Sequence, residues 1–153
     1  MSEILQGLRQ YYRSHLDRHR NRPFLRAVMA ACALVSAAGG NVTFRQRVRV
    51  DLILETLDAL KVFDPHEGVE LFNEFVAALQ ADSATGHRLA REAVSSEVAG
   101  NPEKGQLLMR ICLAVSERDG TISPPEEDEI EALCRWIGID ADSGCLFAGR
   151  HPG

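Results

Sequence analysis

The residues with the clearest chemical potential are three acids grouped around one glycine. Glu117 and Asp119 precede Gly120, and Glu126 follows it on the other side of a short polar loop. Carboxylates spaced in this way can turn their oxygens toward one centre, and hard divalent cations prefer oxygen ligands. The segment therefore predicts a small metal site formed by Asp119, Glu126 and Glu117, which would hold one divalent cation such as calcium, magnesium or manganese.

The spacing of this segment matches the second half of an EF-hand loop, in which an aspartate, a backbone carbonyl and a glutamate converge on calcium. The opening ligand position of such a loop falls on Val115, whose side chain has no donor atom, so a complete EF-hand is excluded. A purely structural interpretation stays open. In that interpretation Glu126 is the acid of a capping box that begins at Ser123, and Asp119-Gly120 is an ordinary turn.

Histidines do not form a second site in the sequence. They are scattered along the chain at His15, His19, His66, His87 and His151. His15 and His19 are four residues apart, a spacing that suits metal binding on a helix, but no third ligand accompanies them. No nucleophile stands beside a base, and no paired carboxylates point to a cleft. We therefore predict that the protein is not an enzyme.

Cysteines are interpreted as structural residues. None of the four forms a C-x-x-C pair. Cys32, Cys112 and Cys134 lie in apolar stretches and are expected to be small buried thiols, whereas Cys145 lies in the C-terminal tail. This use of cysteine fits a reducing compartment.

An internal repeat organises the chain around the acidic loop. A shift of 80 positions aligns residues 29–57 with residues 109–137 without a gap. The matched pairs include Met29 with Met109, Cys32 with Cys112, Gly40 with Gly120, Thr43 with Ser123 and Gln46 with Glu126. Each unit is an apolar helix, a glycine loop, a capping residue and a second helix. We expect the two units to pack face to face around a pseudo-twofold axis.

Capping residues, glycines and prolines divide the chain into about seven helices. They are expected near residues 3–20, 24–38, 43–62, 64–79, 83–99, 101–118 and 123–138. Arg22-Pro23 is expected to break the first helix from the second. The fold class is therefore all-α, a single compact helical bundle with two pseudo-symmetric halves. We divide it into an N-terminal amphipathic basic helix at 1–22, the helical domain at 23–147 and a flexible tail at 148–153.

Composition and charge narrow the functional class. Hydrophobic residues make up 45% and charged residues 25%, as in ordinary globular proteins. No apolar run approaches the roughly 20 residues needed to cross a bilayer, and arginines interrupt the N-terminus where a signal peptide would be apolar. A cytoplasmic location is expected.

The formal charge of −5 is unevenly distributed. Residues 1–26 hold six arginines and two acids, whereas residues 117–142 hold nine acids and two arginines. Such a bipolar surface suits docking or cation binding. Nucleic acid is not an expected partner, because the basic segment is short and carries no reader motif. The basic N-terminal helix could also contact an anionic membrane from the cytoplasmic side.

Three segments together resemble the TerB family of tellurite-resistance proteins. They are Arg20-Asn21-Arg22-Pro23-Phe24 before an alanine-rich helix, Leu60-Lys61-Val62-Phe63-Asp64, and Glu117-Arg118-Asp119-Gly120 followed by Glu126. The resemblance covers about residues 10–140. It implies a helical bundle of two related halves, a divalent-metal surface built from acidic loop residues, and no established catalytic activity. The family's first loop usually has an aspartate before the glycine and an acid at the helix start, where this chain has Gly39 and Gln46.

The expected function is that of a non-enzymatic binding or scaffold module in tellurite or general stress resistance, sensing a divalent cation. The resemblance implies TerC-like membrane proteins and TerD-like proteins as partners, with peripheral contact at the inner membrane, and a homodimer is a further expectation. Two alternatives remain open. One is a degenerate domain that acts as a protein–protein adaptor without metal, and the other is a small metal-dependent enzyme.

Overall fold

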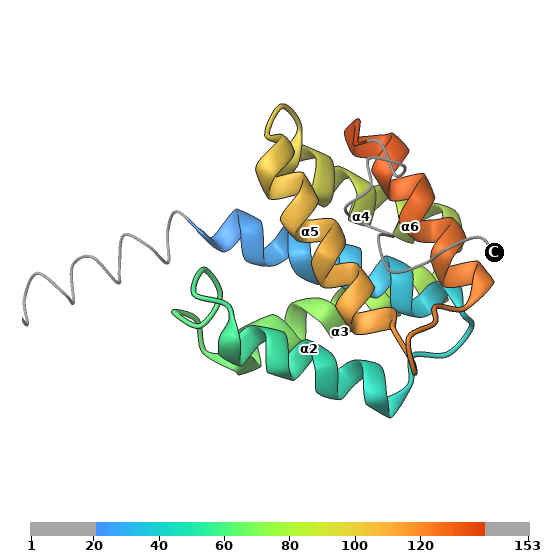
Figure 1. The fold of residues 1–153 in the computed structure, drawn as a ribbon, viewed down its shortest axis with the longest axis horizontal. Coiled ribbons are helices and arrows are strands. Elements are labelled where there is room, and N and C mark those ends of the chain that lie inside the picture. The colour runs from blue at the N-terminus through green and yellow to red at the C-terminus, as the bar shows by residue number, and fades with distance from the viewer. Residues whose placement is uncertain (1–20, 140–153) are drawn as a thin grey trace, which may run out of the picture.

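The computed structural model describes residues 21–139, and the described chain is a bundle of helices (Figure 1). A first helix covers residues 21–38. It is followed by α2 (Phe44–Thr56), α3 (Pro65–Ala81), α4 (Ser83–Val98), α5 (Pro102–Ser116) and α6 (Pro124–Ile137). The only β contact among these residues is an isolated bridge between Arg118 and Thr121. The all-α prediction is confirmed. The helix predicted at 3–20 lies outside the described residues.

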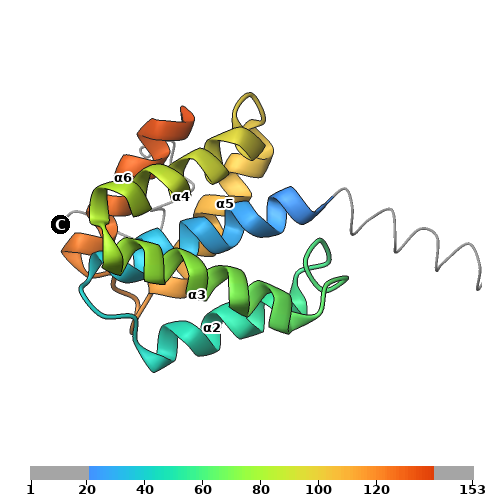
Figure 2. The ribbon, with the colours of Figure 1, turned by 180° about the vertical axis from the view of Figure 1, so that it is seen from behind.

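The helix of residues 21–38 forms the centre of the hydrophobic core. Its residues from Ala27 to Val35 are almost completely inaccessible to solvent. Figures 1 and 2 show it running through the middle of the bundle, with other helices on both of its sides. The predicted break at Arg22-Pro23 is wrong, because both residues are helical. The Arg22 guanidinium forms an ion pair with Glu67 in the first turn of α3, which ties this part of the helix to the bundle.

Helix α2 is shorter than predicted. We expected it to reach about Val62, but it ends at Thr56, and Leu57 adopts an extended conformation with φ −75° and ψ 126°. The chain then folds into turns in which Leu60 and Lys61 donate backbone hydrogen bonds to the carbonyl of Leu57. These turns bury Leu60 completely and Phe63 almost completely. Burial of two large apolar side chains explains why the chain leaves the helix early.

Most of the predicted helix starts are confirmed. Asp64 and Asn101 accept hydrogen bonds from the backbone amides of His66 and Lys104, and each is followed by a proline in the first helical turn. Thr43 and Gln46 form the complete capping box that the sequence predicted at the start of α2. Within residues 21–139, no helix is long and apolar enough to cross a membrane.

Equivalent residues of the two repeat units contact one another in two places. The Gln46 amide donates a hydrogen bond to the Glu126 carboxylate, and these residues are 80 positions apart. Cys32 and Cys112 are also 80 positions apart and completely buried. The hydrogen bond that the Cys112 thiol donates to Cys32, followed by burial, raises the pKa of Cys112 well above its ordinary value. Equivalent residues of two repeats touch each other only close to the axis that relates them. The predicted burial of Cys134 is also confirmed, and Cys145 lies outside the described residues.

Gly86 offers a test of the tight crossing between α3 and α4. A Cβ atom at this position would lie 2.6 Å from Cα of Leu79, a backbone atom that cannot rotate away. We expect Gly86→Ala to lower the free energy of unfolding by about 1–3 kcal/mol, although alanine favours helix. Urea denaturation followed by circular dichroism measures this. Gly105→Ala is the matched control, because its Cβ meets only the ends of isoleucine side chains. Equal stability of the two variants would contradict the close packing.

Candidate functional site

An open cavity of about 620 Å³ lies between the start of α2 in the first repeat and the loop of the second repeat. The cavity is lined by the first turn of α2, the last turn of α5, the loop that follows α5 and the first turn of α6. Its lining residues are Thr43, Phe44, Arg45, Gln46, Val115, Ser116, Glu117, Arg118, Thr121, Ile122, Ser123, Pro124 and Glu126. Glu117 and Glu126, two of the three acids selected from the sequence, therefore face a common space.

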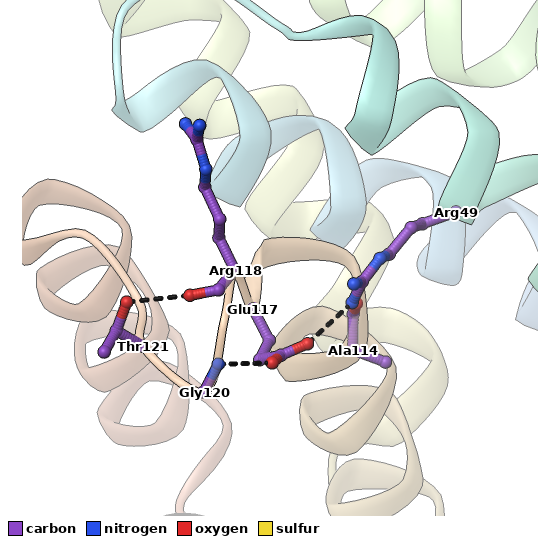
Figure 3. Close-up of polar contacts among 6 residues, drawn as sticks. All are labelled: Arg49, Ala114, Glu117, Arg118, Gly120 and Thr121. Carbon is purple, nitrogen blue, oxygen red and sulfur yellow. Dashed lines mark hydrogen bonds and ion pairs between the residues drawn. The ribbon is translucent and has the colours of Figure 1, made fainter.

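Glu117 is held by donors from both repeats (Figure 3). Its Oε2 accepts a hydrogen bond of 3.0 Å from Nη1 of Arg49 on α2, and its Oε1 accepts one of 2.7 Å from the backbone amide of Gly120. Arg49 also donates to the carbonyl of Ala114 on α5. The Gly120 amide, followed by Arg49, holds the pKa of Glu117 below its ordinary value of 4.5. The carboxylate is thus charged at neutral pH and already has partners.

Asp119 lies in a tight turn and is exposed. Asp119 and Gly120 both have positive φ angles, 52° and 80°, which aspartate tolerates better than most residues. The turn is closed by two backbone hydrogen bonds between Arg118 and Thr121, of 2.7 Å and 2.9 Å. The prediction that Asp119-Gly120 forms a turn is confirmed.

Glu126 is half-buried and is held by two side chains rather than used in a capping box. Ser123 is the residue before α6, but its side chain accepts no hydrogen bond from the helix. Instead its hydroxyl donates to Oε1 of Glu126 at 2.8 Å, while Nε2 of Gln46 donates to Oε2 at 3.0 Å. The predicted capping box at Ser123 is therefore wrong. The partner that keeps the Glu126 carboxylate in this position lies in the other repeat, where a local sequence pattern could not reveal it.

The acids as arranged do not fit a cation. Both oxygens of Glu117 and both oxygens of Glu126 already accept hydrogen bonds. No group of three or more histidine, cysteine, aspartate or glutamate side chains within residues 21–139 is arranged to hold a metal ion. A Cβ at Gly39, where the resemblance implies an aspartate, would lie 3.3 Å from Oε1 of Glu126. Cation binding by Asp119, Glu126 and Glu117 therefore stays a prediction without support from the geometry.

Arginines are the site residues that sequence reasoning missed. Arg45 and Arg118 line the cavity, and Arg49 lies behind Glu117. One signal was available in the repeat itself. The shift of 80 positions places Arg49 on Glu129, so equivalent positions of α2 and α6 carry opposite charges.

The residues that line the cavity lie within a segment that matches a known protein family. The family model described as "Tellurite resistance protein TerB" matches residues 25–144, which include both repeats. A similar curated protein is "Tellurium resistance protein TerB" of Alcaligenes sp. It is 27% identical over 96 residues, which cover 63% of this chain and 78% of that protein. The search of solved structures gave no match.

The interaction between Glu117 and Arg49 predicts a pH-dependent contribution to stability. Because folding lowers the pKa of Glu117, its charged form stabilises the fold above pH 4.5, and this contribution disappears as the pH falls through the folded-state pKa. We expect Glu117→Gln to be less stable than the wild type at pH 7, with a difference that closes near pH ~3. Urea midpoints at the two pH values measure it. Arg49→Gln should show the same trend, and a difference independent of pH would refute the assignment.

The occupied carboxylates also predict weak cation binding. We expect calorimetric titration with calcium, magnesium or manganese to give no saturable heat below about 1 mM, since few free oxygen ligands remain. The double variant Asp119→Ala with Glu126→Ala is the control. Saturable heat in the wild type that is absent from the double variant would show that these acids bind a cation. That result would contradict the prediction.

Proposed function

The chain belongs to the TerB family, and on that basis we propose that it is a non-enzymatic binding module of tellurite resistance whose docking surface is the cavity between its two repeats. The observation that carries this proposal is the exposed apolar edge of that cavity. Phe44, at the start of α2, lines the cavity and is 81% exposed. A phenylalanine in that position buries little surface within its own domain, so its large apolar area is available to a partner.

Two further side chains extend this edge along α2. Val48 and Leu52 are 47% and 57% exposed and follow Phe44 at intervals of four residues, so the three lie on one face of the helix. A smaller cavity of about 220 Å³ lies beside them and is lined by Phe44, Val48, Val69 and Phe72, among others. Contiguous exposed apolar surface of this kind is typical of interaction sites. We define Phe44, Val48 and Leu52 as the α2 stripe.

The bundle gives the α2 stripe a rigid support. The Gln46–Glu126 and Arg49–Glu117 contacts join α2 to the second repeat. The Arg47 guanidinium lies over the Phe72 ring and donates to Asn73, which joins α2 to α3. A partner that docks here would cost the domain little conformational freedom, which favours binding.

Partners and cation sensing form the finer part of the proposal. The resemblance implies TerC-like and TerD-like proteins as partners, with contact at the membrane, and these are the first candidates for the α2 stripe. Cation sensing would require Glu117 and Glu126 to leave Arg49 and Gln46. A cation would then loosen the contacts between the repeats and change the shape of the docking surface.

The experiment compares tellurite tolerance in cells that lack their own copy of the protein and are supplied with variants. We expect Phe44→Ser to reduce tolerance about tenfold, because an interface hot spot of this type contributes at least a factor of about ten in affinity. Leu107→Ser is the matched control. Leu107 is also an exposed apolar residue, 39% exposed, but it lies on α5 outside both cavities.

Both variants are first compared with the wild type for expression and thermal stability. Tolerance lost equally with Phe44→Ser and Leu107→Ser, or retained with both, would exclude the α2 stripe as the docking surface.

A further inference from the structure

The charges of α2 are arranged against the dipole of the helix. Its first turn holds arginines and no acid, whereas its last turn holds Glu55 and no base. A helix is stabilised by acids near its N-terminus and by bases near its C-terminus. Helices α3, α5 and α6 follow this rule, because each has an acid in its first turn. The charges of α2 do not stabilise the domain on its own, and a contact outside the domain would account for them.

The acids of α2 have no cation beside them within the domain. Asp51 and Glu55 are exposed and lie in the second half of the helix. Neither forms an ion pair with any residue between 21 and 139. Arg45, in the first turn, is exposed and forms no ion pair in this range either, although its charge acts on Glu117 from a distance. The exposed face of α2 therefore has one basic end and one acidic end.

The α2 stripe has an apolar side chain at equal distances on both sides of Val48. Phe44 precedes Val48 by four residues and Leu52 follows it by four. An antiparallel copy of α2, related by a twofold axis at Val48, would place Phe44 of each copy against Leu52 of the other. The same rotation would bring Glu55 of each copy to the N-terminal end of α2 in the other, where Arg45 lies. One symmetry operation thus matches both the apolar side chains and the charges.

The cavity beside the α2 stripe has a size that suits a protein side chain. Its volume is about 220 Å³, below the roughly 300 Å³ at which the usual range of small-molecule sites begins. Its lining includes Phe44 and Val48 from α2, and Val69 and Phe72 from α3. Figures 1 and 2 show α2 at the lower edge of the bundle, with no other described helix beyond it. A second copy can therefore reach the stripe and insert an apolar side chain beside it.

The charges of α2 disfavour an anionic surface as the occupant of the stripe. An anionic membrane would attract Arg45 but repel Asp51 and Glu55, which lie on the same face of the helix as Leu52. A second copy of the chain brings the complementary charges by symmetry. Twofold contacts of this self-complementary kind are the commonest in homo-oligomers, and they close without forming filaments.

We propose that the α2 stripe binds the α2 stripe of a second copy of this chain, in an antiparallel twofold dimer with Val48 at the axis. The inference rests on the proposed function, because it names the occupant of the same docking surface. The stripe is short compared with the roughly 800 Å² that each partner buries in a standard interface, so we expect a dissociation constant on the order of 100 μM. A TerC-like or TerD-like partner would then bind the stripe by displacing the second copy.

Sedimentation equilibrium of the full chain at low ionic strength, from about 10 μM to about 1 mM protein, measures the dimer. We expect the wild type to approach the mass of two chains as its concentration rises. Leu52→Ser should raise the dissociation constant at least about tenfold, because each dimer loses two apolar contacts. Leu107→Ser, an exposed leucine of α5, is the matched control and should associate as the wild type does. A wild type that stays monomeric throughout, or a dimer that Leu52→Ser leaves unchanged, would overturn the proposal.

An exchange of charges tests the antiparallel direction. Arg45→Glu and Glu55→Arg should each raise the dissociation constant about fivefold at low ionic strength, because like charges then meet at both ends of the dimer. Both changes complement the dipole of α2, so weaker association would not arise from unfolding. An equal mixture of the two variants should recover the association of the wild type, because unlike charges meet again at both ends. A mixture that associates no better than either variant alone would refute the antiparallel pairing.

This proposal and the proposed function fail separately. If the wild type is monomeric throughout while Phe44→Ser loses tellurite tolerance, the α2 stripe remains a docking surface and its occupant is a different protein. If the dimer forms through α2 while Phe44→Ser retains tolerance, the dimer remains and the role of the stripe in resistance is excluded.

Discussion

The hydrogen bond between Gln46 and Glu126 is the contact on which the arrangement of the two repeats depends. Oε1 of Gln46 accepts from the backbone of Thr43 at 2.9 Å, so its Nε2 must face Glu126 and donate at 3.0 Å. One amide thus caps α2 and joins it to α6. A glutamate in place of Gln46, as the family resemblance implies, would set two carboxylates against each other. Like charges at that distance need a cation or a proton between them. The amide of Gln46 removes that need and satisfies the carboxylate within the protein.

A second difference between the repeats has the same effect on Glu117, which also lines the cavity. Arg49 occupies the position that Glu129 has in the other repeat, and it pairs with Glu117 at 3.0 Å. Both side chains are partly exposed, so this pair alone contributes little to stability. Its larger consequence is chemical, because it occupies a carboxylate that could otherwise have bound a cation. Divergence of α2 from α6 therefore gives Glu117 and Glu126 hydrogen-bond partners on α2.

Local features were predictable from the sequence, and contacts between distant segments were not. The caps at Asp64 and Asn101 depend on residues within three positions, and the repeat itself is visible as matched letters. The end of α2 was missed because burial of Leu60 and Phe63 in the core outweighs helix propensity. The spacing of Glu117 and Glu126 showed that they could approach a common point. It could not show that Arg49 and Gln46, from another part of the chain, occupy their oxygens.

The location of the exposed apolar surface agrees with this division between the repeats. The α2 stripe belongs to the repeat without acids in its loop, whereas the equivalent positions of α6 hold Pro124, Asp128 and Ala132. At these three positions one repeat presents large apolar side chains and the other presents small or charged ones, although Trp136 of α6 is also half-exposed. Exposed apolar area of this kind lowers solubility without stabilising the domain, so the contiguous α2 stripe is better explained by binding than by folding. Folding and binding thus rest on different residues. Contacts between equivalent residues of the two repeats hold the fold, and the residues that differ around the cavity determine what can dock there.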